Sequence, residues 1–128
     1  MEIKDFCTGV QHIGIPTNDI EKTKEFFADL GFEVAYSTVN NGEKVAFLRL
    51  HNLTIETWQN GNAAMKTGSI DHIAIDVKDI DTLFKTVVDK GYIPLEGHVC
   101  SLPYWAHGVK FFTIEGPNKE KIEFCEML

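Results

Sequence analysis

The sequence predicts an α+β protein built from two tandem βαβββ modules, and three observations support this prediction. Residues 12–32 and 72–92 align without a gap at an offset of 60, HIGIPTNDIEKTKEFFADLGF over HIAIDVKDIDTLFKTVVDKGY. Within each copy, a strand-like run precedes a helical pattern and further strand-like runs. Each copy also has a histidine near its start and a glutamate near its end. A long period that occurs twice indicates a duplicated supersecondary module rather than a solenoid.

Each module is expected to begin with a strand followed by a helix. Residues 10–15 (VQHIGI) and 70–75 (IDHIAI) are short and rich in β-branched side chains, which is typical of strands. Asp19 and Asp79 follow, and aspartate is a favoured N-cap residue. Apolar side chains then recur at helical spacing after each aspartate.

Glycine is expected to end each helix, because Gly31 and Gly91 stand where a left-handed residue typically follows the last turn. Three strand-like runs come next in each module. They are FEVAYSTV, KVAFLRL and LTIETW in the first module, and YIPLEGHV, VKFFTI and KIEFCEM in the second, where CSLPYWAHG is predicted to be a loop. Module one thus covers about residues 10–60 and module two about 70–127, in one domain over 1–128.

Composition narrows the class of protein. A length of 128 residues suggests one domain, and a net charge of −7 argues against a nucleic-acid partner and against an acidic membrane surface. No apolar run is long enough to span a membrane, and the N-terminus lacks the apolar core of a signal peptide. The three cysteines, Cys7, Cys100 and Cys125, are odd in number and widely spaced, which favours reduced thiols in a cytoplasmic protein.

Four side chains are candidate metal ligands. His12 and His72 lie on the first predicted strand of each module, and Glu56 and Glu123 lie on the last. A carboxylate on a sheet face of small side chains is costly to bury unless it is paired or bound to a metal. Two imidazoles and two carboxylates suit Zn²⁺, Ni²⁺, Co²⁺, Mn²⁺ or Fe²⁺. The alternative is a duplicated sheet with one solvated face and no metal.

The segments HIGIPTNDIEKTKEFFADLGF, IETW, DHIAIDVKDI and GPNKEKIEF resemble the vicinal oxygen chelate superfamily, from about Val10 to Met127. The resemblance implies the glyoxalase/bleomycin resistance/dioxygenase fold, in which two modules form a partial mixed β-barrel with the helices outside. It also implies one divalent metal ion (Zn, Ni, Co, Mn or Fe) and a homodimer, with the metal site either within one chain or across the dimer. Within the superfamily, the chain looks most like glyoxalase I (lactoylglutathione lyase), whose ligand order is matched by His12, Glu56, His72 and Glu123.

The resemblance implies a lyase or isomerase. Its expected substrate is a small α-hydroxycarbonyl compound or hemithioacetal, and its expected route is a metal-bound enediolate. Glu123 is the expected base, and Glu56 can act on the opposite face of the substrate. The alternatives are a metal-dependent epimerase of the methylmalonyl-CoA epimerase type and a resistance protein that binds a small molecule without catalysis.

Five further residues are candidates for substrate binding. Trp58 follows the glutamate of module one by two residues, so it is expected to face the cavity or, alternatively, to fill the core. Tyr104, Trp105 and His107 lie on the predicted loop and could cap the cavity, while the alternative for Trp105 is that it packs at a subunit contact or fills the mouth of the barrel. Arg49 is the sole arginine, and arginine is the usual partner of a carboxylate ligand.

Overall fold

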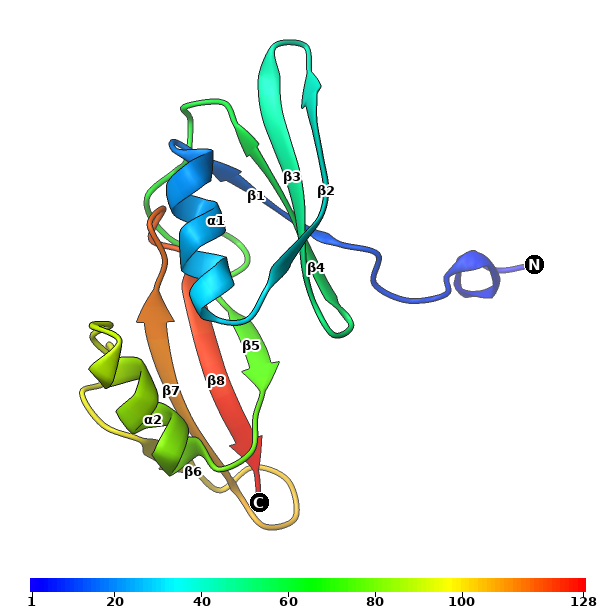
Figure 1. The fold of residues 1–128 in the computed structure, drawn as a ribbon. Helices are drawn as coiled ribbons and strands as arrows, with labels where there is room; N and C mark the ends of the chain where they lie inside the picture. Colours follow the sequence, from blue (N-terminus) through cyan, green and yellow to red (C-terminus); the bar gives the residue numbers. More distant parts are fainter. The chain divides into compact units, whose positions relative to one another are not determined.

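The computed structural model describes residues Met1 to Leu128, and the chain divides into two compact units, Met1–Ala63 and Ala64–Leu128. Each unit is a four-stranded mixed sheet with one α-helix on one face (Figure 1). The predicted α+β class with two βαβββ modules is therefore confirmed. Neither α-helix has the length and apolar character that crossing a membrane would require.

Unit one has the strand order β1-β4-β3-β2, with β1 parallel to β4 and the other pairs antiparallel. Its helix begins after Asp19, whose side chain accepts hydrogen bonds from the backbone N–H groups of Glu21 and Lys22, so Asp19 caps the helix as the sequence predicted. Gly31 follows the helix with φ +104°, a conformation that glycine adopts without strain. The elements are η1 (Ile3–Phe6), β1 (Ile13–Thr17), α1 (Ile20–Asp29), β2 (Glu33–Asn40), β3 (Glu43–Leu50) and β4 (Leu53–Gln59).

Unit two repeats this topology with the strand order β5-β8-β7-β6, again with the outer pair β5 and β8 parallel. Gly91 ends its helix with φ +96°. The elements are β5 (Ile73–Asp76), α2 (Ile80–Asp89), β6 (Cys100–Leu102), β7 (Val109–Glu115) and β8 (Lys121–Met127).

The core of each unit lies between the helix and the sheet. In both units, apolar side chains from the helix and from the two central strands are almost fully excluded from solvent. They are Ile20, Phe27, Leu48 and Ile55 in unit one, and Ile80, Phe112, Ile114 and Ile122 in unit two. Because strand side chains alternate between faces, the other face of each sheet is left for the remaining residues, including the two predicted glutamate ligands.

The strand predicted over residues 92–99 is wrong, because that segment is irregular and β6 lies later, at Cys100–Leu102. Proline at position 94 cannot donate to a strand ladder, and Gly97 adopts a positive φ in a turn. Leu95 instead donates one backbone hydrogen bond to the Thr113 carbonyl at 2.8 Å. Part of the segment CSLPYWAHG, predicted to be a loop, therefore forms the strand.

The first strand of each module also begins later than predicted. His12 and His72 each lie one residue before β1 and β5, rather than within a strand. Their side chains nevertheless lie beside the parallel partner strands, since Ile13 pairs with Ile55 and Ile73 with Ile122.

Asp79 is the N-cap residue of α2, as the sequence predicted, but its side chain does not cap the helix. Asp79 occupies the N-cap position with φ +52°, and its side chain accepts no hydrogen bond there. The carboxylate of Glu126 on β8 takes this role, accepting from the backbone N–H groups of Asp79 and Ile80 at 3.0 Å each. Gln59 is placed equivalently on β4, and its Oε1 accepts from the N–H of Ile20 at 2.9 Å. The last strand of each module thus fixes the start of its own helix.

Candidate metal centre

The predicted glutamate ligands lie at equivalent positions on the sheet face opposite the helix. Glu56 on β4 is flanked by Gly14 on β1 and Phe47 on β3. Glu123 on β8 is flanked by Ala74 on β5 and by Thr113 on β7. Each carboxylate therefore has a small residue on its β1 or β5 side, which leaves room for the neighbouring histidine.

In unit one, His12 and Glu56 face each other. The imidazole Nε2 lies 3.6 Å from Glu56 Oε1, and about a third of each side chain is exposed. The edge of the His12 ring meets Phe47, with ring centroids 5.7 Å apart. The imidazole is therefore held against an aromatic wall while its Nε2 points to the carboxylate.

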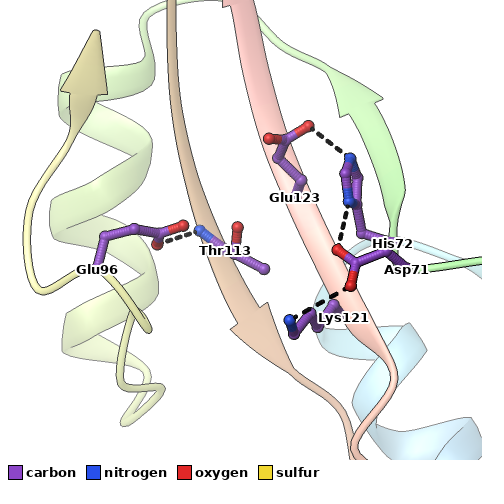
Figure 2. Close-up of polar contacts among 6 residues, drawn as sticks. All are labelled: Asp71, His72, Glu96, Thr113, Lys121 and Glu123. Atoms are coloured by element: carbon purple, nitrogen blue, oxygen red, sulfur yellow. Dashed lines mark hydrogen bonds and ion pairs between the residues drawn. The ribbon is translucent and has the colours of Figure 1, made fainter. Parts of the chain in front are cut away.

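Unit two repeats the pairing. His72 Nε2 lies 3.5 Å from Glu123 Oε2 (Figure 2), and the Glu123 side chain, at 18% exposure, is more buried than that of Glu56 at 30%. Thr113 stands on the other side of Glu123, and its backbone N–H donates to Glu96 Oε1 at 2.7 Å. The surroundings of Glu123 are thus polar, whereas those of Glu56 are aromatic.

The second ring nitrogen of each histidine is also occupied. His12 Nδ1 lies 2.9 Å from Gln11 Oε1, and His72 Nδ1 lies 2.9 Å from Asp71 Oδ2. A carboxylate and an amide oxygen only accept hydrogen bonds, so each Nδ1 is the donor. In the neutral ring, this tautomer leaves Nε2 with a lone pair.

This donor set fits a divalent cation. The Nε2-to-carboxylate separations exceed the 2.7–3.2 Å of an N–H···O hydrogen bond. With the proton on Nδ1, each Nε2 lone pair and its facing carboxylate oxygen are two acceptors, an arrangement that a cation satisfies. Each unit brings together two of the four predicted ligands, and no group of three or more His, Cys, Asp or Glu side chains suited to a metal occurs in the structure.

The electrostatic environment of Glu123 suits a proton acceptor. Burial raises the pKa of its carboxyl group above the usual value, and the carboxylates of Glu96 and Asp71 raise it further, while His72 acts in the opposite direction. The hydrogen bond from His72 lowers the pKa of Asp71, and the positive charge of Lys121, 3.6 Å away, also contributes. The same region therefore keeps Asp71 ionised and makes Glu123 more basic.

Trp58 lies on the same face as Glu56, two residues further along β4. A side chain at position 14 would meet two Trp58 ring atoms at 3.1 and 3.2 Å, so the indole lies over Gly14. Arg49 on β3 is exposed, and its Nε donates to Thr54 Oγ1 at 3.3 Å. It borders a hollow of about 400 Å³ with the start of β2 and the β3–β4 turn.

The three loop candidates lie elsewhere on unit two. Trp105 and His107, with Leu128, line a hollow of about 590 Å³ after β6, and Tyr104 beside them is exposed. This hollow adjoins the C-terminal end of β8, since the N–H of Leu128 donates to the Gly108 carbonyl. Glu123 lies nearer the other end of β8, so within this unit the structure does not bring the loop to the His72–Glu123 pair.

Sequence reasoning missed several neighbours of the candidate ligands. Gln11 and Asp71 immediately precede the two repeated histidines, and their shared position and shared ability to accept a hydrogen bond were the available signal. Tyr36 carried no such signal, because a β-bulge after Val34 shifts the register. The shift pairs Tyr36 with Phe47 and so turns the tyrosine to the same face as Glu56.

The duplicated βαβββ module is the fold of the vicinal oxygen chelate class. The chain matches the family model described as the Glyoxalase/Bleomycin resistance protein/Dioxygenase superfamily over residues 11–113 of its 128, and it belongs to that superfamily. It matches no curated protein in sequence.

Solved structures agree with this assignment at the level of the fold. A glyoxalase family protein from Enterococcus faecalis superposes with a TM-score of 0.79 at 19% identity, covering 94% of this chain and 99% of that one. The fosfomycin resistance protein FosX from Listeria monocytogenes gives 0.74 at 17% identity, covering 95% of each chain. FosX has also been solved in complex with Mn(II) and sulfate, and that structure gives a TM-score of 0.68 at 17% identity, covering 95% of this chain and 94% of that one.

Proposed function

We propose that this chain is a divalent-metal-dependent lyase or isomerase of the glyoxalase type. In this proposal, His12, Glu56, His72 and Glu123 together hold one ion, contributed by one chain or by the two chains of a homodimer. The observation that carries the proposal is the repeated geometry, in which an imidazole Nε2 faces a glutamate oxygen at 3.6 Å in one module and 3.5 Å in the other. The close approach of an imidazole and a carboxylate in both modules favours a metal site over a solvated sheet face.

The proposed substrate class comes from the resemblance to glyoxalase I, and the donor set is compatible with it. His12, Glu56, His72 and Glu123 would hold the ion, and its remaining coordination positions would accept neighbouring oxygens of a small α-hydroxycarbonyl compound or hemithioacetal. When bound, the ion supplies Lewis-acid stabilisation of negative charge on those oxygens.

Glu123 is the proposed general base. It removes a proton from the carbon beside the carbonyl group and returns it to the neighbouring carbon. Its raised pKa supports this role, because a base is most effective when its pKa approaches the working pH. Glu56 is the proposed partner on the opposite face, where it could accept or donate the proton for the other stereochemistry.

Unit one is the proposed wall for the organic part of the substrate. Trp58, Phe47 and Tyr36 share the face of Glu56, and aromatic side chains commonly line small-molecule sites. Arg49 is the proposed contact for an anionic group. The loop carries Tyr104, Trp105 and His107. In this proposal it contacts either a substrate that is long enough to reach it or a second subunit.

The likeness in fold to FosX favours a second candidate, a metal-dependent resistance protein for a small oxygen-rich molecule. An epimerase remains the third. The predicted ligand Glu56 favours the glyoxalase type over these, because the order His12, Glu56, His72 and Glu123 matches the ligand order of glyoxalase I.

The decisive assay combines metal loading with substrates of the first two candidate functions. Purified protein loaded in turn with Zn²⁺, Ni²⁺, Co²⁺, Mn²⁺ and Fe²⁺ is incubated with the glutathione hemithioacetal of methylglyoxal and, separately, with fosfomycin. Turnover of the hemithioacetal, lost in Glu123→Gln, supports the proposal. Modification of fosfomycin alone would replace the proposed lyase with a resistance enzyme, and inactivity on both with every metal would exclude the lactoylglutathione lyase type.

A further inference from the structure

Both candidate histidines have their Nδ1 atoms held by the side chain of the preceding residue. The two contacts have the same length, 2.9 Å, but the acceptor is an amide oxygen for His12 and a carboxylate oxygen for His72. Gln11 and Asp71 occupy the same position in the repeat. The two modules therefore share this contact, but the acceptor is neutral in module one and negatively charged in module two.

The consequence for each ring is directional. An acceptor at Nδ1 fixes the proton there and turns Nε2, with its lone pair, away from the preceding residue. In both units that Nε2 faces the glutamate of the same module. A histidine free to rotate, or free to change tautomer, would offer a lone pair in this direction only part of the time.

We infer that Asp71 and Gln11 are positioning residues that preorganise His72 and His12 as Nε2 metal ligands, and that Asp71 makes His72 the stronger of the two. The inference rests on the proposed metal site and adds two residues to it. A carboxylate behind a ligand histidine raises the basicity of the ring, and loss of such a partner typically lowers metal affinity about 10–100-fold. An amide orients the ring without this increase.

A third side chain keeps Asp71 in place. Lys121 on β8 lies 3.6 Å from Asp71 Oδ1, while Oδ2 accepts from His72, so the two carboxylate oxygens are engaged on different sides (Figure 2). Gln11 has no corresponding charged partner among its hydrogen bonds and ion pairs. The asymmetry between the two modules thus extends beyond the two acceptors themselves.

The first test is metal affinity, measured by competition between the protein and a chromophoric chelator for Zn²⁺. Asp71→Ala should weaken binding about 10–100-fold, and Asp71→Asn, which keeps an acceptor, should lose less. Gln11→Ala should weaken binding less than Asp71→Ala does, and Gln11→Glu should strengthen it. The matched control is Asp76→Ala, which removes an exposed aspartate of the same unit that has no contact with His72.

The second test needs no metal. Nitrogen-15 NMR of histidine-labelled, metal-free protein should show His72 mainly as the Nδ1–H tautomer in the wild type and in Asp71→Asn, and as a mixture in Asp71→Ala. A merely structural role for Asp71 would leave the tautomer unchanged. The same measurement serves if Asp71→Ala proves less stable, because the spectrum reports on the folded fraction.

Three results would overturn the inference. They are equal Zn²⁺ affinity in Asp71→Ala and the wild type, an equal loss in Asp76→Ala, or a His72 tautomer that does not depend on Asp71. Failure of the proposed function looks different, since wild-type protein would then bind no metal while the tautomer experiment would still report whether Asp71 positions His72.

Discussion

At the scale of single residues, Gly14 shows how the two modules diverged around a common site. The equivalent position in unit two is Ala74, which also lies beside the glutamate of its module. Gly14 cannot be alanine without contact to Trp58, because the added Cβ would lie 3.1 Å from the indole. Glycine at position 14 therefore makes room for the Trp58 ring. In unit two, where the equivalent residue is alanine, Cys125 on β8 takes the place of the tryptophan.

Gly14→Ala is expected to displace the Trp58 ring by a few tenths of an ångström, with a loss of at most about 1–2 kcal/mol in the free energy of unfolding. Tryptophan fluorescence and urea denaturation measure the two effects. The control is Gly68→Ala, where the added Cβ meets nothing within 4 Å. An unchanged emission spectrum in Gly14→Ala would contradict the packing of Trp58 over Gly14.

Glu120 is a half-buried glutamate in the turn before β8. Its Oε2 is buried and has no hydrogen-bond partner, while Oε1 accepts from the N–H of Asn118 at 3.1 Å. Burial raises the pKa of this carboxyl group above its unfolded value, although the hydrogen bonds from Asn118 act against the shift. Stability is then fully present below the unfolded pKa and is lost as the pH rises through the raised folded pKa.

Glu120→Gln is therefore expected to stabilise the protein relative to the wild type near neutral pH, and the difference should shrink towards about pH 4. The amide oxygen still accepts from Asn118, but the ionised form no longer has to be buried. Urea denaturation at about pH 4 and about pH 7.5 checks this expectation. If the stability difference between Glu120→Gln and the wild type grew on acidification, the result would contradict a raised pKa of Glu120.

At the scale of elements, the helices depend on the last strand of their own module. Glu126 places a carboxylate at the N-terminus of α2, where it accepts two backbone hydrogen bonds and also meets the positive end of the helix dipole. Gln59 makes one such bond to α1, where Asp19 also caps with its side chain. Helix α2 therefore relies on β8 more than α1 relies on β4.

Glu126→Ala is expected to cost about 1–2 kcal/mol in the free energy of unfolding, in line with the loss of an N-cap. Gln59→Ala should cost less, because Asp19 remains. Chemical denaturation measures both, with Glu43→Ala, an exposed glutamate at the start of β3, as the control. Equal losses in Glu126→Ala and Gln59→Ala would argue against unequal reliance on the last strand.

The elements that could be predicted from the sequence were those with local signals. Both helices end before glycines with positive φ, and the aspartate before α1 caps as expected. The failure at residues 92–99 was also physical, because β-propensity there was outweighed by Pro94 and by a turn. The cap of α2 was unpredictable locally, since its donor and acceptor lie 46 residues apart.

The candidate site was likewise predictable from the sequence only in part. The repeat revealed His12, His72, Glu56 and Glu123, because duplication leaves a signal that a lone histidine lacks. The position of Tyr36 on the face of Glu56 depends on a β-bulge, and no residue type in that strand predicts the bulge.

At the scale of the whole molecule, the chain consists of two units of the same topology that supply two candidate ligands each. Two ligands alone rarely hold a divalent ion firmly, whereas four can hold it and would leave open positions on an ion that takes more than four ligands. The proposed function therefore makes each unit dependent on the other for metal binding. Binding of the ion to the folded state would also raise stability, by about 2.7 kcal/mol when free metal is 100 times the dissociation constant.

Catalysis and metal binding should separate in one variant. Glu123→Gln keeps an amide oxygen as a ligand but removes the base, so turnover should fall about 10²–10⁴-fold while metal content falls much less. Steady-state kinetics with metal analysis of the same sample measures both quantities. Retained turnover would remove Glu123 as the base and leave Glu56 as the candidate.

The most direct test of the central claim is metal stoichiometry by elemental analysis of wild-type protein and of Glu56→Ala and Glu123→Ala. The account predicts close to one divalent ion per chain in the wild type, and a near-complete loss in each variant, although each removes a ligand from only one unit. Metal content that is absent from the wild type, or that survives at half its value in each variant, would contradict a single four-ligand centre.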